Sequence, residues 1–173
     1  PFISLLEVTR IGLLARRVSY KAMTLPRTPA LATDCVIFDP IGRVLLIRRK
    51  HSPCAGNHAL PGGFVKVGET VEEACRREVG EETSIELGEL TLVGVYSDVN
   101  RDPRGHIVSV AYATQLPSVA LPRAGSDATN AEWLDTREVT LGSDHARILA
   151  DANAKIFTHP TGKGHFFFDS SLI

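Results

Sequence analysis

Hydrophobic and polar residues recur along the chain with two different periods, separated by stretches of turn residues. Runs typical of strands, rich in β-branched and apolar residues, lie at residues 31–38, 44–47, 90–96, 107–114 and 131–134. Residues 39–42 read Asp-Pro-Ile-Gly, which is typical of a type I turn, so residues 31–49 are predicted to form a β-hairpin. Helical spacing predicts helices over residues 71–83 and 144–157, whereas prolines and glycines predict a loop over 50–63. Because strands and helices do not alternate regularly, we expect an α/β fold with a mixed sheet between helices.

The predicted helix 71–83 places acidic residues where apolar ones are expected. Thr70 and Glu73 form a capping box, and Glu73 lies four residues before an arginine, a spacing that favours an ion pair. On a helical projection, Glu78 and Glu82 fall within about 20° of the centre of the apolar face, and Glu81 falls about 80° away. Carboxylates beside a core and near a helix C-terminus are unfavourable unless they are paired or bind a metal.

Two interpretations of these acidic residues remain open. In the first, the helix face opens to solvent and nearby arginines pair with the carboxylates. In the second, the carboxylates bind a hard divalent cation such as Mg²⁺, which takes oxygen ligands and is often shared with substrate phosphates. Pro61-Gly62-Gly63, just before the helix, favours the second interpretation, because glycine lets the backbone approach a ligand closely.

The composition is that of an ordinary globular protein. The 173 residues suit one domain, and 43% hydrophobic with 23% charged residues excludes a disordered or low-complexity chain. A formal net charge of −1 argues against a bulk nucleic-acid binder, and the absence of a long uncharged apolar run argues against a membrane partner. Three cysteines without a C-x-x-C pair indicate free thiols in a reducing compartment, so we expect a cytoplasmic protein.

Charge is segregated along the chain. Residues 1–28 carry five basic residues and one acid, a net charge of +4. They are predicted to form an N-terminal arm that either packs on the domain or contacts a dimer partner. Residues 29–173 are predicted to form the domain. Residues 40–68 hold five basic residues and no acid, whereas residues 69–89 hold eight glutamates and two arginines, a net −6. An acidic segment beside a basic one suits a metal-bound ligand rich in phosphate, with Arg48 or Arg49 contacting phosphate or ribose.

Residues 63–85 resemble the Nudix box, whose pattern is G-x5-E-x7-R-E-U-x-E-E-x-G-U with U an aliphatic residue. The chain reads GFVKVGETVEEACRREVGEETSI over this stretch, and every charged position matches. The one departure is Ser84, which stands at the last glycine of the pattern. A left-handed conformation is usual at this helix C-cap, so serine is expected to cost about 1 kcal/mol without removing a ligand.

This resemblance implies a Nudix-type α/β/α sandwich with a mixed sheet, and hydrolysis of a nucleoside diphosphate derivative with Mg²⁺ or Mn²⁺. By position, the implied metal ligands are Glu78, Glu81 and Glu82 with the Gly63 carbonyl. Glu78, Glu82 and Arg77 are the implied catalytic residues, with Arg77 orienting Glu78, and Glu69 is its structural partner. The general base is Glu78 or a residue outside the box, for which Asp127 and Glu132 are the candidates.

Residues 94–98, 101–106 and 127–133 resemble the ADP-ribose pyrophosphatase-like branch of this family, although a proline typical of that branch is replaced by Val99. The branch implies cleavage of ADP-ribose into AMP and ribose 5-phosphate by a homodimer that binds a small nucleotide and no nucleic acid. The expected substrate-binding residues are Arg48, Arg49, Phe64 and Arg104. The alternatives are a pyrophosphatase for nucleoside triphosphates or modified nucleotides, and a non-catalytic domain that senses ADP-ribose; the complete set of box glutamates argues against the second.

Overall fold

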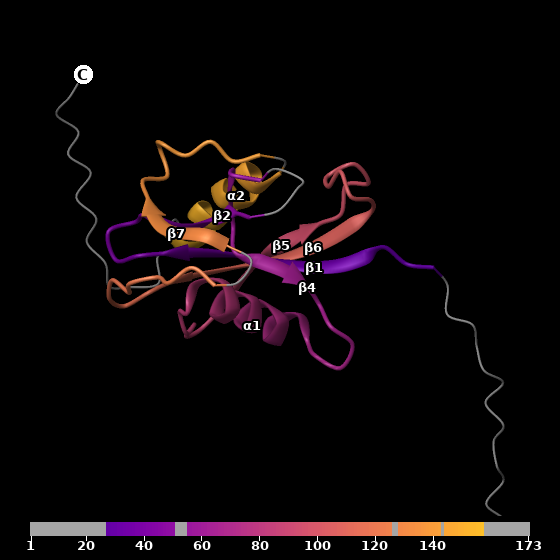
Figure 1. The fold of residues 1–173 in the computed structure, drawn as a ribbon, viewed down its shortest axis with the longest axis horizontal. Helices are drawn as coiled ribbons and strands as arrows, with labels where there is room; N and C mark the ends of the chain where they lie inside the picture. The colour runs from indigo at the N-terminus through magenta and orange to yellow at the C-terminus, as the bar shows by residue number, and fades with distance from the viewer. Residues whose placement is uncertain (1–26, 51–54, 126–127, 143, 158–173) are drawn as a thin grey trace, which may run out of the picture.

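Two helices pack on opposite faces of a mixed β-sheet (Figure 1). The computed structural model describes residues 27–50, 55–125, 128–142 and 144–157, so nearly all of the predicted arm lies outside the described residues. Helix α1 spans Val71–Thr83 and helix α2 spans His145–Phe157. The strands are β1 (Ala30–Phe38), β2 (Val44–Arg49), β3 (His58–Ala59), β4 (Gly62–Phe64), β5 (Thr91–Tyr96), β6 (Ile107–Gln115) and β7 (Ala128–Leu134). The predicted α/β/α sandwich is therefore confirmed.

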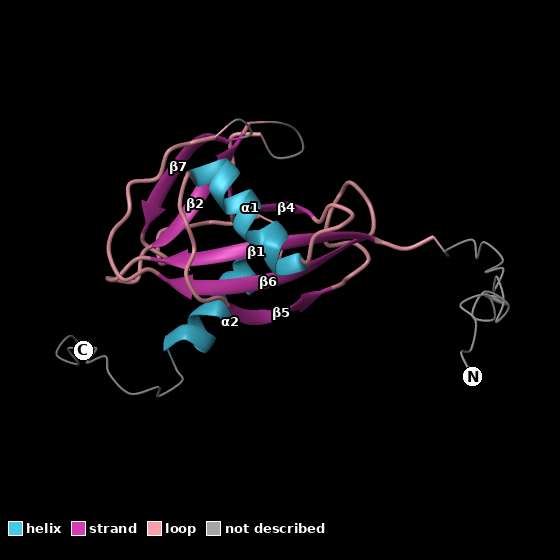
Figure 2. Ribbon diagram, turned by 90° about the horizontal axis from the view of Figure 1, so that it is seen from below, coloured by secondary structure: helices cyan, strands magenta, loops and turns pink. Residues whose placement is uncertain are grey.

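The sheet is mixed because β1 runs parallel to β6, whereas the other pairs are antiparallel. The main strand order is β3-β2-β1-β6-β5, with β4 paired to β1 and β7 paired to β2. In Figure 2, α1 crosses the near face of the sheet, α2 lies behind it, and β5 and β7 lie on opposite sides. Only Phe38 and Val44 pair β1 with β2, and the start of β1 pairs with β4 instead. This exchange of partners brings the glycines of β4 beside α1.

Alternation along β1 divides the core into two layers. Val36 and Phe38 pack with the residues of α2, whereas Cys35 and Ile37 pack with Cys75 and other residues of α1. Successive side chains of a strand point to opposite faces, so a central strand covered by helices on both faces is apolar at nearly every position. Cys35 and Cys75 are buried free thiols, as the cysteine spacing predicts, and Cys54 lies outside the described residues.

Most predicted elements are found, with one clear error. Helix α1 has the predicted bounds, α2 begins one residue later than predicted, and the last strand begins three residues earlier than predicted. The prediction of a loop over 50–63 is wrong in part, because β3 and β4 lie at 58–59 and 62–64. These strands are held by backbone pairing, and a Gly-Gly sequence has no side-chain alternation to reveal a strand. In the described part of the chain, no helix is long and apolar enough to cross a membrane.

Candidate active site

The ends of α1 fix the position of its acidic residues. At the N-terminus, the Glu73 backbone N–H donates to Thr70 Oγ1 at 3.2 Å, and the Thr70 N–H donates to Glu73 Oε2 at 2.7 Å, which confirms the capping box. At the C-terminus, Ser84 takes the left-handed conformation, with φ 58° and ψ 23°, and its N–H donates to the Gly80 carbonyl. The helix therefore ends where the box pattern places its glycine, although serine occupies the position.

Arg77 connects the carboxylates of the box to one another and to β4. All three nitrogens of its guanidinium donate: Nε and Nη2 to Glu69 at 3.0 and 2.7 Å, and Nη1 to Glu78 at 2.6 Å. Nη1 also donates to Glu81 at 3.3 Å, and Nη2 also donates to the Phe64 carbonyl at 3.1 Å. The planar guanidinium suits such a set of directed bonds, so Arg77 fixes where the Glu78 carboxylate lies.

The predicted ion pair between Glu73 and Arg77 is wrong. The Glu73 carboxylate accepts hydrogen bonds from the backbone N–H and the hydroxyl of Thr70, and Arg77 is turned to Glu69 instead. A capping box uses the carboxylate that an ion pair would need, so the two predicted interactions compete and the cap forms.

Glu69 stays ionised over a wide pH range. The two bonds from Arg77, together with the Lys66 backbone N–H at 2.7 Å, lower the pKa of the Glu69 carboxyl to about 2. The same pairing raises the pKa of Arg77, mainly through its bond to Glu69. Hydrogen bonds to the charged form of a carboxylate stabilise it, so the predicted structural partnership of Glu69 and Arg77 is a fixed ion pair.

The two glycines of β4 make room for the carboxylates of α1. The Gly62 N–H donates to Glu82 Oε2 at 2.9 Å, and Glu82 is only 8% exposed. A Cβ atom on Gly63 would lie 2.5 Å from Oε1 and 2.7 Å from Oε2 of Glu78. A Cβ on Gly62 would collide with the Thr33 carbonyl. Gly62 therefore has no room for a side chain, and a side chain at Gly63 would displace the Glu78 carboxylate. The backbone of β4 and two carboxylates of the box form one surface.

This surface lines a cavity of about 500 Å³, which is within the usual range for small-molecule sites. Its acidic lining residues are Asp34, Glu78, Glu82 and Asp102, and the glycines of β4 lie beside the two glutamates. Basic residues line the same cavity: Arg49, Lys50, Lys66, Arg101 and Arg104. The two oppositely charged segments of the sequence therefore meet in a single cavity. We name it the main cavity.

Three of the four expected substrate-binding residues line the main cavity. Arg49, Phe64 and Arg104 do so, and the Arg104 Cζ atom lies 5.2 Å from the centre of the Phe64 ring. Arg48 does not line this cavity; its Nη1 donates to the Gly56 carbonyl at 3.1 Å, and its Nη2 lies 3.2 Å from His58 Nε2. Neighbouring residues of a strand point to opposite faces, and the sequence does not decide which of two adjacent arginines faces the site.

Of the candidate bases that the structure describes, Glu78 lines the main cavity and Glu132 does not. Glu132 lies on β7, outside the cavity lining, with Oε1 3.0 Å from His58 Nε2 and 3.6 Å from Arg48 Nη2. Its hydrogen bond with His58 lowers the pKa of the Glu132 carboxyl. Asp127 lies outside the described residues. The structure therefore brings Glu78 and Glu82 together and leaves Glu132 in a separate polar cluster.

Two of the three box glutamates expected to bind a metal line the main cavity, and Glu81 does not. Glu81 is 53% exposed, lies near Arg77 and Lys66, and is not part of the cavity lining. Within the described ranges, no three His, Cys, Asp or Glu side chains are gathered as a metal-ligand cluster. Glu78 and Glu82 nevertheless offer carboxylate oxygens beside the Gly63 backbone, and Mg²⁺ commonly binds few carboxylates together with substrate phosphates. The residues present fit such an ion.

A buried charged network, which sequence reasoning did not identify, lines part of the main cavity through Asp34, Arg101 and His145. Arg101 is 5% exposed and donates to Asp144 through Nε at 2.6 Å and Nη2 at 2.9 Å. Ser109 Oγ donates to Asp34 Oδ2 at 2.5 Å, and Arg101 Nη2 lies 3.5 Å from the same oxygen. Asp34 also lies 3.7 Å from His145 Nε2. The sequence gives one signal of this network, which is Asp34 within the apolar run 31–38. A buried carboxylate needs charged or hydrogen-bonding partners, so its position predicts such a network.

An α/β/α sandwich with box carboxylates and basic side chains in one cavity defines a class of hydrolases that act on phosphate anhydrides. The chain belongs to the NUDIX domain family, which matches residues 28–152, and hydrolases of this family generally use a divalent metal ion. It is similar to an ADP-ribose pyrophosphatase of Methanocaldococcus jannaschii, with 45% identity over 124 residues, covering 71% of this chain and 72% of the relative.

Two solved structures are also similar. A MutT/nudix family protein from Enterococcus faecalis has a TM-score of 0.74 and 28% identity, covering 92% of this chain and 77% of the other. The NUDIX domain of Shewanella oneidensis NrtR, solved in complex with ADP ribose, has a TM-score of 0.70 and covers 88% of this chain and 99% of the other. At 23% identity, this second likeness supports the fold alone.

Proposed function

We propose that this protein hydrolyses ADP-ribose to AMP and ribose 5-phosphate. The observation that carries the proposal is the main cavity, where Glu78 and Glu82 of the box lie in the same lining as Arg49 and Arg104. A diphosphate needs positive groups around its oxygens, and an attacking water needs a proton acceptor and an activated position. The name of the Methanocaldococcus relative supports ADP-ribose as the substrate.

Glu78 and Glu82, beside the Gly63 carbonyl, would hold Mg²⁺ or Mn²⁺, with Glu81, which lies outside the cavity lining, as the third carboxylate of the box. The ion would neutralise the diphosphate and lower the pKa of a bound water. Arg49 and Arg104 bind the phosphate oxygens. The oxygen of water bonds to one phosphorus, and the bond from that phosphorus to the bridging oxygen breaks. The proton of the water goes to a carboxylate; Glu78 is the base that the cavity supports, and Asp127 is the candidate outside the box.

Two other functions could use the same cavity. A pyrophosphatase for triphosphates or modified nucleotides would use the same carboxylates but release pyrophosphate or a different monophosphate. A non-catalytic sensor of ADP-ribose would bind the ligand without turnover. The placement of Glu78 and Glu82 on the cavity favours an enzyme, since a sensor does not need two carboxylates beside a diphosphate.

The expected setting of the enzyme is also part of the proposal. The protein acts as a homodimer in the cytoplasm, on a small nucleotide and not on nucleic acid. Buried free thiols support a reducing compartment, and the near-neutral net charge supports a small substrate. Light scattering on the purified chain, with and without residues 1–28, measures the oligomeric state and the part that this arm plays in it.

The test of the function is a substrate panel. Purified protein with Mg²⁺ is expected to release AMP and ribose 5-phosphate in equal amounts from ADP-ribose, and Glu82→Gln to lower kcat by about a hundredfold or more. Glu72→Gln is the matched control, because Glu72 lies on the same helix but pairs with Arg76 away from the cavity. If no nucleoside diphosphate derivative is turned over, the proposal that the protein is an enzyme is wrong. Pyrophosphate release from a triphosphate would favour the nucleoside triphosphate pyrophosphatase.

A further inference from the structure

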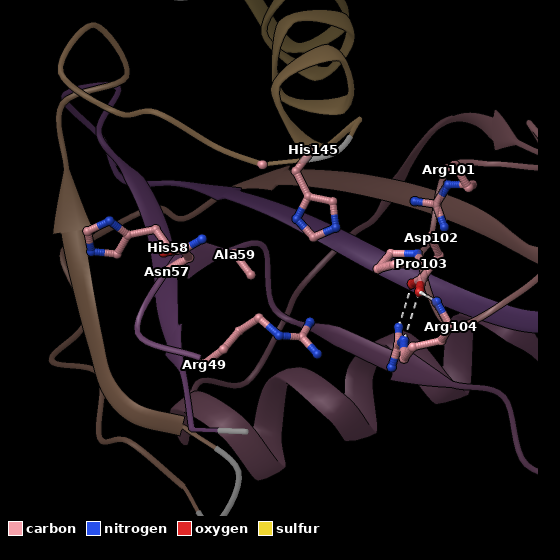
Figure 3. Close-up of a pocket in the computed structure, with 10 residues that line it drawn as sticks. Arg49, Asn57, His58, Ala59, Arg101, Asp102, Pro103, Arg104 and His145 are labelled. Carbon is pink, nitrogen blue, oxygen red and sulfur yellow. Dashed lines mark hydrogen bonds and ion pairs between the residues drawn. The ribbon is translucent and has the colours of Figure 1, made fainter. Parts of the chain in front are cut away.

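The loop of residues 97–106 joins β5 to β6 and carries two arginines that line the main cavity, Arg101 and Arg104. The proposed function uses Arg104 as a phosphate-binding residue and gives no role to Arg101. Figure 3 shows both arginines, with dashed lines that join the Arg104 guanidinium to the carboxylate of Asp102. Each arginine of the loop is paired with an aspartate, and the two pairs have different consequences for the loop.

Arg101 binds the loop to the start of α2. Its guanidinium makes a two-pronged ion pair with Asp144, the residue before α2, with 2.6 Å from Nε to Oδ2 and 2.9 Å from Nη2 to Oδ1. Nη2 also lies 3.5 Å from Oδ2 of Asp34 on β1. The Arg101 side chain is only 5% exposed, so most of its surface is already in contact with protein. This geometry suits an anchor of the loop better than a group that binds a ligand.

The burial of this ion pair is not explained by stability alone. A buried ion pair that is replaced by apolar residues of similar volume often leaves a protein as stable as before, or more stable. Buried ion pairs are best attested where they specify one arrangement of the chain. Arg101 and Asp144 are 43 residues apart in sequence, so their pairing fixes the loop relative to the helix.

Asp102 sets the direction of Arg104 within the loop. The Arg104 guanidinium donates to both Asp102 oxygens, from Nε at 2.9 Å and from Nη2 at 2.6 Å, and the Arg104 backbone N–H donates to Oδ1 at 2.9 Å. These bonds, mainly those of the guanidinium, lower the pKa of the Asp102 carboxyl to about 2. Arg104 Cζ lies 5.2 Å from the centre of the Phe64 ring, and the guanidinium keeps further N–H groups that can donate to a phosphate.

The two ion pairs are connected through adjacent residues of the loop. The pair of Arg101 with Asp144 fixes where the loop lies, and Asp102, the next residue, fixes how Arg104 points. The Gly105 N–H donates to the Asp102 carbonyl at 3.2 Å and closes the turn that carries Arg104. An arginine that is already held in its binding direction loses less conformational freedom when the ligand binds.

We propose that Asp144 is a positioning residue for the phosphate-binding Arg104, and that it acts through Arg101 and the 97–106 loop. The inference rests on the proposed function, in which Arg104 binds the diphosphate. Asp144 lies outside the lining of the main cavity, so it affects the substrate without touching it. The start of α2 therefore controls how tightly the diphosphate binds and leaves the chemical step unchanged.

Asp144→Asn tests this role, because asparagine keeps the size of the side chain but removes its charge and one of its two acceptors for Arg101. Calorimetry with ADP and Mg²⁺ measures the binding of a nucleoside diphosphate. We expect binding to weaken by about 3- to 10-fold, since Arg104 then has to be ordered when the ligand binds. Removal of a negative charge alone would strengthen the binding of an anion. Tighter or unchanged binding would therefore overturn the positioning role.

A second variant and a control accompany this measurement. Arg101→Lys keeps the buried positive charge but cannot make the two-pronged bond to Asp144, so the same weakening is expected even if Asp144→Asn is unstable. Asp151→Asn is the matched control, because Asp151 lies on α2, accepts a hydrogen bond from the Tyr96 hydroxyl at 2.8 Å and is outside the cavity lining. Its affinity for ADP is expected to stay within about twofold of the unmodified protein.

A double-mutant cycle shows whether the effect passes through Arg104. Arg104→Gln alone is expected to weaken ADP binding by about tenfold or more, and adding Asp144→Asn should then change the affinity by less than about twofold. If Asp144→Asn weakens binding equally with and without Arg104, its effect is a general structural one and the positioning role is wrong. In turnover of ADP-ribose, Asp144→Asn is expected to raise KM and to leave kcat within about twofold.

Binding of ADP needs no hydrolysis, so this inference and the proposed function can fail separately. If Asp144→Asn weakens ADP binding through Arg104 but the unmodified protein does not cleave ADP-ribose, the hydrolysis fails and the positioning role remains. If the unmodified protein cleaves ADP-ribose and Asp144→Asn keeps its ADP affinity and KM, the positioning role fails and the hydrolysis remains. If the unmodified protein does not bind ADP, the positioning role fails whatever the substrate panel shows.

Discussion

Arg77 and Glu69 are joined by two parallel hydrogen bonds, one of 2.7 Å from Nη2 to Oε1 and one of 3.0 Å from Nε to Oε2. This pairing holds the plane of the guanidinium, and the remaining N–H groups then reach Glu78, Glu81 and the Phe64 carbonyl. Glu69 therefore acts on the main cavity through Arg77. Mutation of a residue that holds a metal-binding carboxylate in place typically costs about 10- to 100-fold in metal affinity or activity.

Arg77→Lys is expected to lower kcat/KM by about 10- to 100-fold. Lysine keeps the charge, but its ammonium group cannot make the two-pronged bond to Glu69 while also reaching Glu78 and the Phe64 carbonyl. Steady-state kinetics over a range of Mg²⁺ concentrations measures the effect, and part of the loss is expected as a weaker apparent affinity for Mg²⁺. Arg76→Lys is the control, because Arg76 pairs with Glu72 and with the carbonyls of Leu87 and Gly88. Equal losses in both variants would contradict the role given to Arg77.

The pairing of Glu69 also predicts how stability depends on pH. The pKa of Glu69 is about 2 in the folded protein, against about 4.3 for an unperturbed glutamate, so the folded chain binds fewer protons at this site. The stabilisation by Glu69 is complete above about pH 5 and is lost as the pH falls toward about 2. Urea unfolding of the protein and of Glu69→Gln should show a difference in free energy that shrinks over this window. A difference that stays constant with pH would mean that the charge of Glu69 does not stabilise the fold.

Gly63→Ala tests the close approach of β4 to α1. A Cβ atom at this position would overlap the Glu78 carboxylate, so the carboxylate must move or the strand must shift. We expect kcat/KM to fall by about a hundredfold, since small displacements of reacting groups have effects of this size. Gly88→Ala is the control, because a Cβ there meets no atom within 4 Å. If Gly63→Ala keeps full activity with an unchanged melting temperature, Glu78 is not held by this contact.

The sequence predicts local features of this protein better than contacts between distant segments. Helix α1 has its predicted bounds because the capping box at Thr70 and the box pattern at Ser84 are local signals. The network of Asp34, Arg101 and His145 was not predicted, because it joins a strand, a loop and a helix that are far apart in sequence. The alternation of a strand shows that Arg48 and Arg49 point to opposite faces of the sheet, but it does not show which face meets the cavity. The sequence therefore could not distinguish the two arginines as substrate-binding residues, whereas in the structure Arg49 lines the main cavity and Arg48 bonds to the Gly56 carbonyl.

Ser84→Gly is expected to stabilise the protein by about 1 kcal/mol, which corresponds to a rise in melting temperature of about 2–4 °C for a chain of this size. Ser84 has a φ of 58°, the one positive value among the non-glycine residues that the structure describes, and glycine adopts this conformation without strain. Ser97→Gly is the control, because Ser97 is also exposed but lacks a positive φ. There, glycine only adds freedom to the unfolded chain and is expected to destabilise by about 0.5–1 kcal/mol. Thermal and urea unfolding measure both variants. A lower stability of Ser84→Gly would show that the serine side chain contributes more to the cap than its strained backbone costs.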